Sequence, residues 1–116
     1  MNHKIALIFG VSLLTTSFDA SANFLCNGTV NYLGMEGSGK VFVSLNDTSH
    51  IHAICNVNDQ GAYSVTTTAC KSMYATLLLA KSTSRSVTLY YTDTTFTCAT
   101  IPNWGGMPST YFVELD

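Results

Sequence analysis

The histidines at positions 50 and 52 are the residues whose type and spacing come closest to a chemical site in this 116-residue chain. Because side chains alternate along a β-strand, His50 and His52 would lie on one face of an extended segment. Two imidazoles on one face could bind a metal ion or act in acid–base catalysis. However, residues 23–116 contain no third histidine, and the carboxylates are scattered. We interpret the pair as neighbours on a polar strand face and predict neither a metal ion nor a cofactor.

The nucleophiles and acids of the chain also lack the arrangement of an active site. Serine and threonine are abundant, but there is no Gly-x-Ser-x-Gly motif, and Gly37-Ser38-Gly39 is typical of a hairpin turn. Hydrolysis of a glycoside needs two carboxyl groups held close together. The candidate acids all fall in predicted turns, namely Glu36, Asp47, Asp59 and Asp93. We therefore predict a binding protein and not an enzyme.

A glycine-flanked tryptophan is the most ligand-like feature of the sequence. Trp104 is the only tryptophan, and it stands in the segment Asn103-Trp104-Gly105-Gly106. An aromatic face can stack on the apolar C–H face of a sugar, while amides and hydroxyls bind its polar rim. We predict that Trp104 and Asn103 bind a ligand, together with Tyr32 and Tyr63. In the alternative interpretation Trp104 fills one end of a β-barrel, because buried aromatic side chains are common.

The charge of the chain excludes one class of partner. The sequence has 5 Lys and Arg against 7 Asp and Glu, which gives a formal net charge of −2. Surfaces that bind nucleic acid are basic, and no cluster of Lys or Arg is present, so nucleic acid is not an expected partner. The polar residues are mostly Ser, Thr and Asn, which suit neutral ligands. Beyond the N-terminal region, no apolar run is long enough to span a membrane.

The N-terminal region has the pattern of a signal peptide. Lys4 precedes the apolar run Ile5–Leu14, and Ala20-Ser21-Ala22 offers small residues before a cleavage site. The run is too short to cross a bilayer comfortably. We therefore predict a signal peptide at residues 1–22, a single domain at residues 23–116, and a secreted or periplasmic protein.

Four cysteines lie in the predicted domain, at positions 26, 55, 70 and 98. An even number in a small exported domain predicts two disulfide bonds, for which three pairings are possible. Zinc is the alternative ligand of such cysteines. No two of them stand two to four residues apart, however, so the usual spacing of a zinc knuckle is absent. We therefore predict disulfides and no zinc.

The elements that must position these residues are five strands and one helix. Alternation of apolar and polar residues predicts the strands, and turn-forming residues separate them. The spacing of Met73, Leu77 and Ala80 puts them on one face of a helix. This helix would begin after a threonine cap at position 66, 67 or 68 and end before a polar turn at Ser82–Ser86. The predicted strands are Cys26–Leu33, Lys40–Leu45, His50–Val57, Ser86–Thr92 and Ser109–Leu115.

The order of these elements predicts a β-rich α+β domain. Three strands, a helix and two strands follow the chain order of the OB-fold, a five-stranded Greek-key barrel with a helix between strands three and four. In such a barrel the first and fourth strands are antiparallel neighbours, so Cys26 at the start of one lies near Cys98 after the other. Cys55 ends the third strand, and Cys70 opens the helix that follows. The barrel therefore predicts the bonds Cys26–Cys98 and Cys55–Cys70.

Two stretches of the chain carry a resemblance to a known family, His52-Ala53-Ile54-Cys55 at a strand end and the helix, turn and strand of Tyr74–Tyr91. They resemble the cell-binding B subunits of bacterial AB5 toxins, of the pertussis-like and subtilase-cytotoxin-like types. The resemblance implies an OB-fold, binding of a cell-surface glycan, assembly into a homo-pentamer and an A subunit as partner. It also implies a second apolar helix face toward neighbouring subunits, formed by Ala75, Leu78, Leu79 and Ser82. The alternative function is a monomeric envelope protein that binds or inhibits a partner protein through an exposed strand edge.

Overall fold

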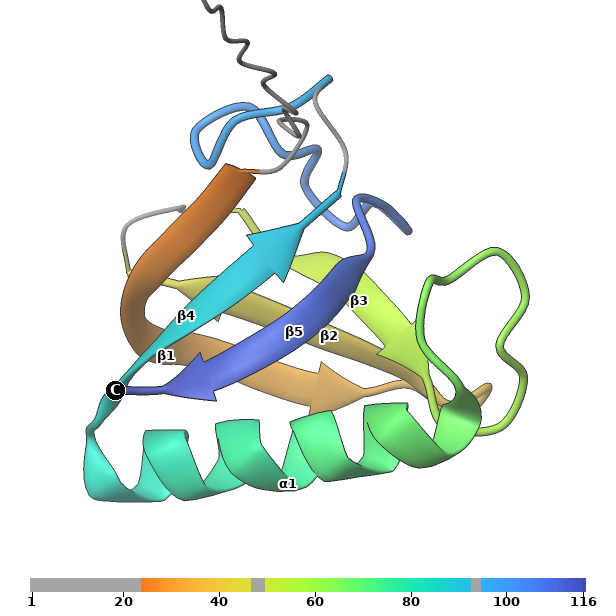
Figure 1. Cartoon of the computed structure of the whole chain (residues 1–116), viewed down its shortest axis with the longest axis horizontal. Coiled ribbons are helices and arrows are strands. Elements are labelled where there is room, and N and C mark those ends of the chain that lie inside the picture. The colour runs from red at the N-terminus through yellow and green to blue at the C-terminus, as the bar shows by residue number, and fades with distance from the viewer. Residues whose placement is uncertain (1–23, 47–49, 93–94) are drawn as a thin grey trace, which may run out of the picture.

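The computed structural model describes residues 24–46, 50–92 and 95–116, which form a five-stranded antiparallel sheet and one helix (Figure 1). The predicted signal peptide, residues 1–22, lies outside the described residues. The sheet and the helix confirm the predicted β-rich domain, and the strand ends differ from the predicted ones by a few residues. The elements are β1 Phe24–Met35, β2 Lys40–Leu45, β3 His52–Asn56, α1 Thr67–Thr83, β4 Ser86–Tyr91 and β5 Thr110–Leu115.

β1 is the strand that joins the two halves of the sheet, whose strand order is β3-β2-β1-β4-β5. Residues 24–29 of β1 pair with β4, and residues 30–35 pair with β2, with a register shift between Val30 and Tyr32. β1 therefore bends as it passes from one half to the other, and the sheet curls around a common core (Figure 1). Aliphatic residues from both halves fill that core, among them Val41, Val43, Leu45, Val87 and Leu89.

The two edge strands, β3 and β5, do not pair with each other, so strand pairing does not close the predicted barrel. Instead, the segment that leads into β5 lies along β3. His52 and Gly105 form a parallel bridge, and the Ala53 N–H donates to the Gly105 carbonyl over 2.8 Å. Pro102 and Pro108 flank this contact and have no N–H to donate. The hydrogen bonds between β3 and this segment therefore do not continue as a β-ladder. A loop borders β3 at the place where a closed barrel would have a strand.

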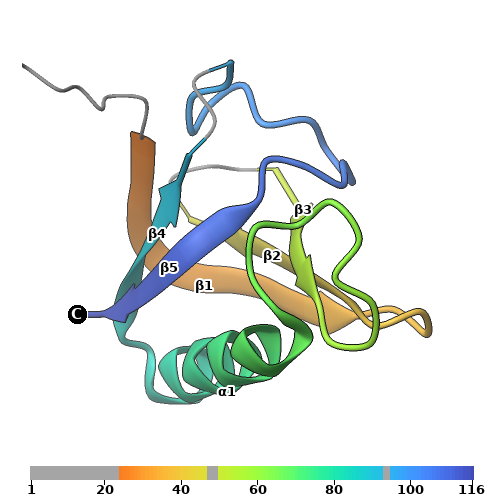
Figure 2. The same ribbon diagram turned by 45° about the vertical axis from the view of Figure 1, so that its right-hand side comes forward.

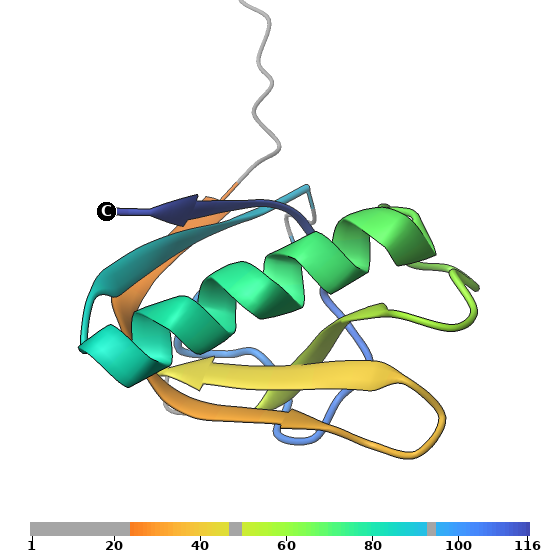
Figure 3. The ribbon, with the colours of Figure 1, turned by 90° about the horizontal axis from the view of Figure 1, so that it is seen from below.

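α1 lies across the open side of the curled sheet, with β4 and β5 to one side of it and β2 to the other, while β1 runs from the first side to the second (Figure 3). Thr66 caps its first turn, because its hydroxyl accepts a hydrogen bond from the N–H three residues on. The helix ends before Ser84, which adopts a left-handed backbone with a φ of 57°. On the outer side, Leu78 and Leu79 are each 50% exposed. The inward face is the predicted one and contains Met73, Leu77 and Ala80.

Both predicted disulfide bonds are present, and all four cysteines are oxidised. Cys26 of β1 is bonded to Cys98, and Cys55 of β3 is bonded to Cys70 of α1, each with Cα atoms 5.7 Å apart. The first bond ties the segment before β5 to β1, and the second ties α1 to an edge strand. The second bond closes a loop with a sequence separation of 15, for which loss of chain entropy predicts a stabilisation of about 3 kcal/mol.

The connection between β3 and α1, residues 57–66, forms a broad loop beside the β1–β2 hairpin (Figure 2). The Val57 N–H donates to the Gly39 carbonyl over 2.9 Å, and the Asn58 side-chain amide donates to the Ser38 carbonyl over 3.4 Å. The loop and the hairpin turn therefore form one continuous surface, which borders the candidate site.

Candidate functional site

Trp104 lies on the surface, and its backbone adopts an unusual conformation. The side chain is 55% exposed, and its φ of 62° lies in the left-handed region that residues other than glycine seldom adopt. The residue of this segment that enters the core is Ile101, which is fully buried. The alternative in which Trp104 fills one end of the barrel is therefore wrong, because the core position nearest to it along the chain is taken by an aliphatic side chain.

Hydrogen bonds to the start of β3 fix the loop around Trp104. The Ile51 N–H donates to Asn103 Oδ1 over 3.2 Å, and the Trp104 N–H donates to the Ile51 carbonyl. On the other side, the Gly105 carbonyl accepts from the Ala53 N–H. Unfavourable backbone conformations persist where surrounding contacts enforce them, and they concentrate at functional sites. These bonds use no atom of the indole, which stays on the surface while its backbone is held.

Two further aromatic rings meet Trp104 on this surface. The ring centroid of Tyr32 lies 5.8 Å from that of Trp104 at an interplanar angle of 83°, and the Phe42 centroid lies 5.5 Å away at 59°. We call Tyr32, Phe42 and Trp104 the aromatic platform. Tyr32 comes from β1 and Phe42 from the neighbouring β2. Two paired strands and a loop distant in sequence thus build one apolar surface.

Gly34 makes room for the Tyr32 ring. It lies opposite Phe42 in the β1–β2 ladder and two residues beyond Tyr32, on the same face of the strand. A Cβ atom on Gly34 would stand 3.0 Å from the Tyr32 hydroxyl oxygen and 3.1 Å from its Cε1 atom, a tight contact. The glycines with positive φ in the described chain are Gly39 and Gly61. The Tyr32 ring, and not the backbone conformation, is therefore what a side chain at position 34 would meet.

Polar groups border the platform where the hairpin turn meets the 57–66 loop. The Tyr63 hydroxyl lies 3.6 Å from the position that a Cβ of Gly106 would take. Its pKa is raised by burial and, to a lesser degree, by the charge of Glu36, so it remains a neutral donor and acceptor. The Lys40 carbonyl accepts from the Glu36 N–H over 3.0 Å, and alternation puts the Lys40 side chain on the face of Phe42. We call Glu36, Lys40 and Tyr63 the rim of the platform. Their side chains supply a carboxylate, an ammonium and a hydroxyl.

The four residues predicted to bind a ligand take three different places. Trp104 and Tyr32 are in contact within the platform, and Tyr63 lies at the rim. Asn103 uses its side-chain oxygen to hold the loop against Ile51. The sequence prediction omits Phe42, although Val41-Phe42-Val43 gives a signal, because a phenylalanine between two inward valines must point outward.

No protein-family model matches the chain, and no curated protein or solved structure matches it either. In the part of the chain that the structure describes, no helix is both long and apolar enough to cross a membrane. Function therefore has to be argued from the platform and its surroundings.

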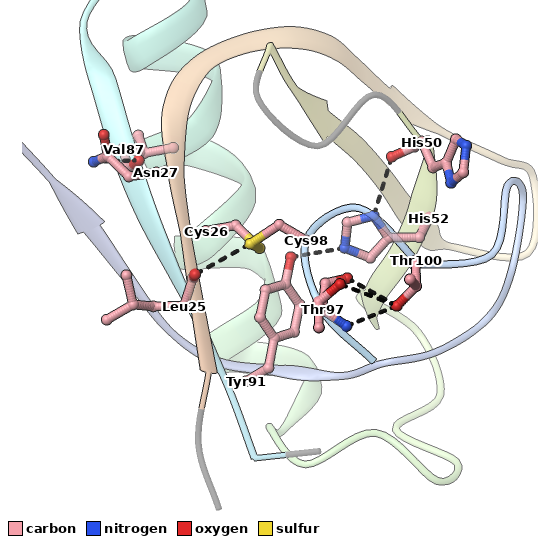
Figure 4. Close-up of a disulfide and its surroundings, with 10 residues drawn as sticks. All are labelled: Leu25, Cys26, Asn27, His50, His52, Val87, Tyr91, Thr97, Cys98 and Thr100. Atoms are coloured by element: carbon pink, nitrogen blue, oxygen red, sulfur yellow. Dashed lines mark hydrogen bonds between the residues drawn. A yellow bond between two sulfur atoms is a disulfide. The ribbon is translucent and has the colours of Figure 1, made fainter. Parts of the chain in front are cut away.

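The two histidines do not form a shared site. His52 is fully buried; its Nε2 lies 2.7 Å from the Tyr91 hydroxyl, and its Nδ1 lies 3.4 Å from the His50 carbonyl (Figure 4). The His50 ring contacts the Ile101 carbonyl instead. The predicted placement on a polar face is wrong for His52, because the register of β3 on β2 sets it opposite the core residue Val43. No group of three potential metal ligands occurs among the described residues.

The buried imidazole of His52 is neutral and has one defined tautomer. Burial lowers its pKa from 6.5 to about 4. The His50 carbonyl can only accept, so Nδ1 carries the proton and Nε2 accepts from the Tyr91 hydroxyl. Tyr91 in turn stacks on Phe24 with ring centroids 4.6 Å apart. His52 is therefore a structural group, on the segment whose backbone holds the Trp104 loop.

Proposed function

We propose that this protein is an exported glycan-binding protein with an OB-fold-like barrel. Three features support the fold: the strand order, the sharing of β1 between two half-sheets, and the helix between β3 and β4. OB-folds bind ligands on the face of strands two and three and in the loops that join strands one to two and four to five. Phe42 on β2, the β1–β2 turn and Trp104 on the β4–β5 connection belong to the corresponding elements, whereas Tyr32 comes from β1 and Tyr63 from the 57–66 loop.

The observation that carries the proposal is the exposed indole of Trp104 on a backbone that is held in the left-handed region. The indole takes no part in the hydrogen bonds of its loop; it packs against Tyr32 and Phe42 and still leaves more than half of the residue exposed. A sugar that covers about 100 Å² of apolar surface on the platform would gain about 2.5 kcal/mol. Even with hydrogen bonds from the rim, a single sugar would bind weakly, in the millimolar range.

Weak individual sites would gain strength from assembly, because several platforms on one particle bind a glycan-covered surface together. We propose the homo-pentamer with an A subunit that the AB5 toxin resemblance implies. The half-exposed Leu78 and Leu79 on the outer side of α1 support an interface there. The native mass of the purified protein tests this assembly, and a monomeric mass would favour the second candidate function.

The second candidate is a monomeric envelope protein that binds a partner protein, and a different surface favours it. Leu25, Tyr90 and Phe112 lie opposite one another in a row across β1, β4 and β5. Leu25 and Phe112 are 52% and 50% exposed, and β5 is an edge strand of the sheet. An apolar row beside a sheet edge suits the addition of a strand from another protein.

A glycan array with the protein purified from an oxidising compartment tests the proposed function. We expect Trp104→Ala to lose at least about tenfold in affinity, which corresponds to about 1.4 kcal/mol. Phe112→Ala is the matched control, because it removes a similarly exposed ring from the other half of the sheet. It should bind glycans like the unaltered protein. The proposal fails if the unaltered protein binds no glycan, or if Trp104→Ala binds equally well.

A further inference from the structure

The shape and charge of the aromatic platform select among sugars. Resting on the glycan binding proposed above, we infer that the ligand is a neutral sugar and that Gly34 is the residue that positions Tyr32 for it.

Tyr32 and Trp104 form two sides of an exposed corner, because their rings meet at 83°. Phe42 lies beside the indole at 59° and continues the apolar surface. Tyr32 is 38% exposed and Trp104 is 55% exposed, so both rings can be reached from solvent. A pyranose is a flat ring with C–H groups on its faces and hydroxyls at its edge. Stacked on one wall of the corner, it would meet the other wall with its edge.

The charges beside this corner cancel. Glu36 and Lys40 have opposite charges and flank the β1–β2 turn, where their backbones are hydrogen-bonded. A carboxylated or sulfated sugar is usually held by an arginine fork or a net positive charge, and the corner has neither among the described residues. The Glu36 carboxylate accepts hydrogen bonds from hydroxyls and repels a sugar acid. Of the other described cations, Lys71 and Arg85 lie at the two ends of α1, and the Lys81 ammonium is held by the Asn31 carbonyl, to which it donates over 3.3 Å.

Gly34 sets the position of the Tyr32 wall. The Tyr32 ring lies over the glycine so closely that a Cβ would come within 3.0 to 3.3 Å of three of its atoms. Because the backbone of Gly34 is an ordinary strand, alanine would fit the strand, and the Tyr32 ring would have to shift by a few tenths of an ångström from its place beside Trp104. Gly37 offers a matched control in the same hairpin, since a Cβ there meets nothing within 4 Å.

The first experiment compares neutral glycans with the same glycans after sialic acid is added to their ends. Trp104 is the only tryptophan, so its fluorescence reports occupancy of the platform directly. We expect the neutral member of each pair to bind at least about tenfold more tightly. If the sialylated members bind more tightly, and the variant Lys40→Ala loses this preference, this inference is overturned and the proposed function still stands. Binding of neither member would overturn both.

The second experiment tests the positioning role. Gly34→Ala should weaken the binding of neutral glycans by about tenfold, Tyr32→Ala should weaken it similarly, and Gly37→Ala should leave it unchanged. The indole N–H signal of Trp104 in an NMR spectrum should shift in Gly34→Ala, because the Tyr32 ring beside it is displaced. A change in thermal stability alone would not produce that shift. Equal affinities and equal indole signals in Gly34→Ala and Gly37→Ala would refute the positioning role.

Discussion

Protonation of His52 should destabilise the folded domain as the pH falls below neutral. The imidazole is fully buried, it accepts a hydrogen bond from Tyr91, and its pKa in the folded protein is about 4 against 6.5 in the ordinary state. The unfolded chain therefore takes up a proton near pH 6.5, while the folded chain resists it until about pH 4. The contribution of His52 to the free energy of unfolding is therefore fully present above pH 6.5. It decreases as the pH falls from 6.5 to about 4 and changes no further below that pH.

The size of the effect follows from the two pKa values. At about 1.4 kcal/mol per pKa unit, their difference corresponds to a loss of about 3 kcal/mol in the free energy of unfolding at low pH. About 2 kcal/mol of this is already lost at pH 5. For a domain of this size, a loss of about 3 kcal/mol lowers the thermal midpoint by roughly 12 to 24 °C. Such a change is large compared with the total stability of a small domain.

Urea unfolding at a series of pH values between 4 and 8 measures this dependence. His52→Gln removes the titrating group and keeps a side chain that can bond the Tyr91 hydroxyl, so the decrease between pH 6.5 and pH 4 should become shallower by about 3 kcal/mol. His50→Gln serves as the control: it keeps the backbone carbonyl that contacts His52 and removes only the smaller Coulombic effect of the His50 ring, so most of the steep decrease should remain. An unchanged pH dependence in His52→Gln, or an NMR titration that places the His52 pKa near 6.5, would refute the reasoning.

Two further substitutions test what holds the sheet and the helix together. Leu77→Ala should lower the free energy of unfolding in urea by about 2 to 5 kcal/mol, because Leu77 is fully buried between α1 and the sheet; the same substitution at the half-exposed Leu78 should change it far less. Replacing Cys55 and Cys70 together with serine should lower the thermal midpoint by roughly 12 to 24 °C through the loss of about 3 kcal/mol. A midpoint that stays within a few degrees would show that this bond contributes little.

The elements and the disulfides could be predicted because they depend on local pattern and chain order. Met73, Leu77 and Ala80 share a helix face, and the order of strands brings Cys26 near Cys98. Barrel closure could not be predicted in this way, because it depends on the backbone groups of the segment before β5. The prolines there and the bonds at Ile51 and Ala53 give a loop contact in place of a ladder.

The site was predictable in part. A lone tryptophan between an asparagine and two glycines is visible in the sequence. Its exposure depends on tertiary structure, because hydrogen bonds to residues about 50 positions earlier hold its loop, such as the bond between Asn103 and Ile51. The placement of His52 was missed because β3 is buried along its whole length, so its two faces do not differ in hydrophobicity. Alternation cannot tell inside from outside in such a strand.

The segment His50–Ala53 links the stability of the core to the presentation of the platform. Its side chain at position 52 enters the core against Tyr91, while the backbone of Ile51 and Ala53 holds the loop of Trp104. An imidazolium at position 52 can reach water only if this segment moves away from Tyr91, and that movement breaks the bonds to the loop. It also opens the end of the β2–β3 ladder, where His52 and Ala53 pair with β2. The β1–β2 and β1–β4 ladders stay paired, so this sheet edge can open at a lower free energy than the whole domain. Acid should therefore release Trp104 from Tyr32 and Phe42 first, which makes binding more sensitive to low pH than the fold itself.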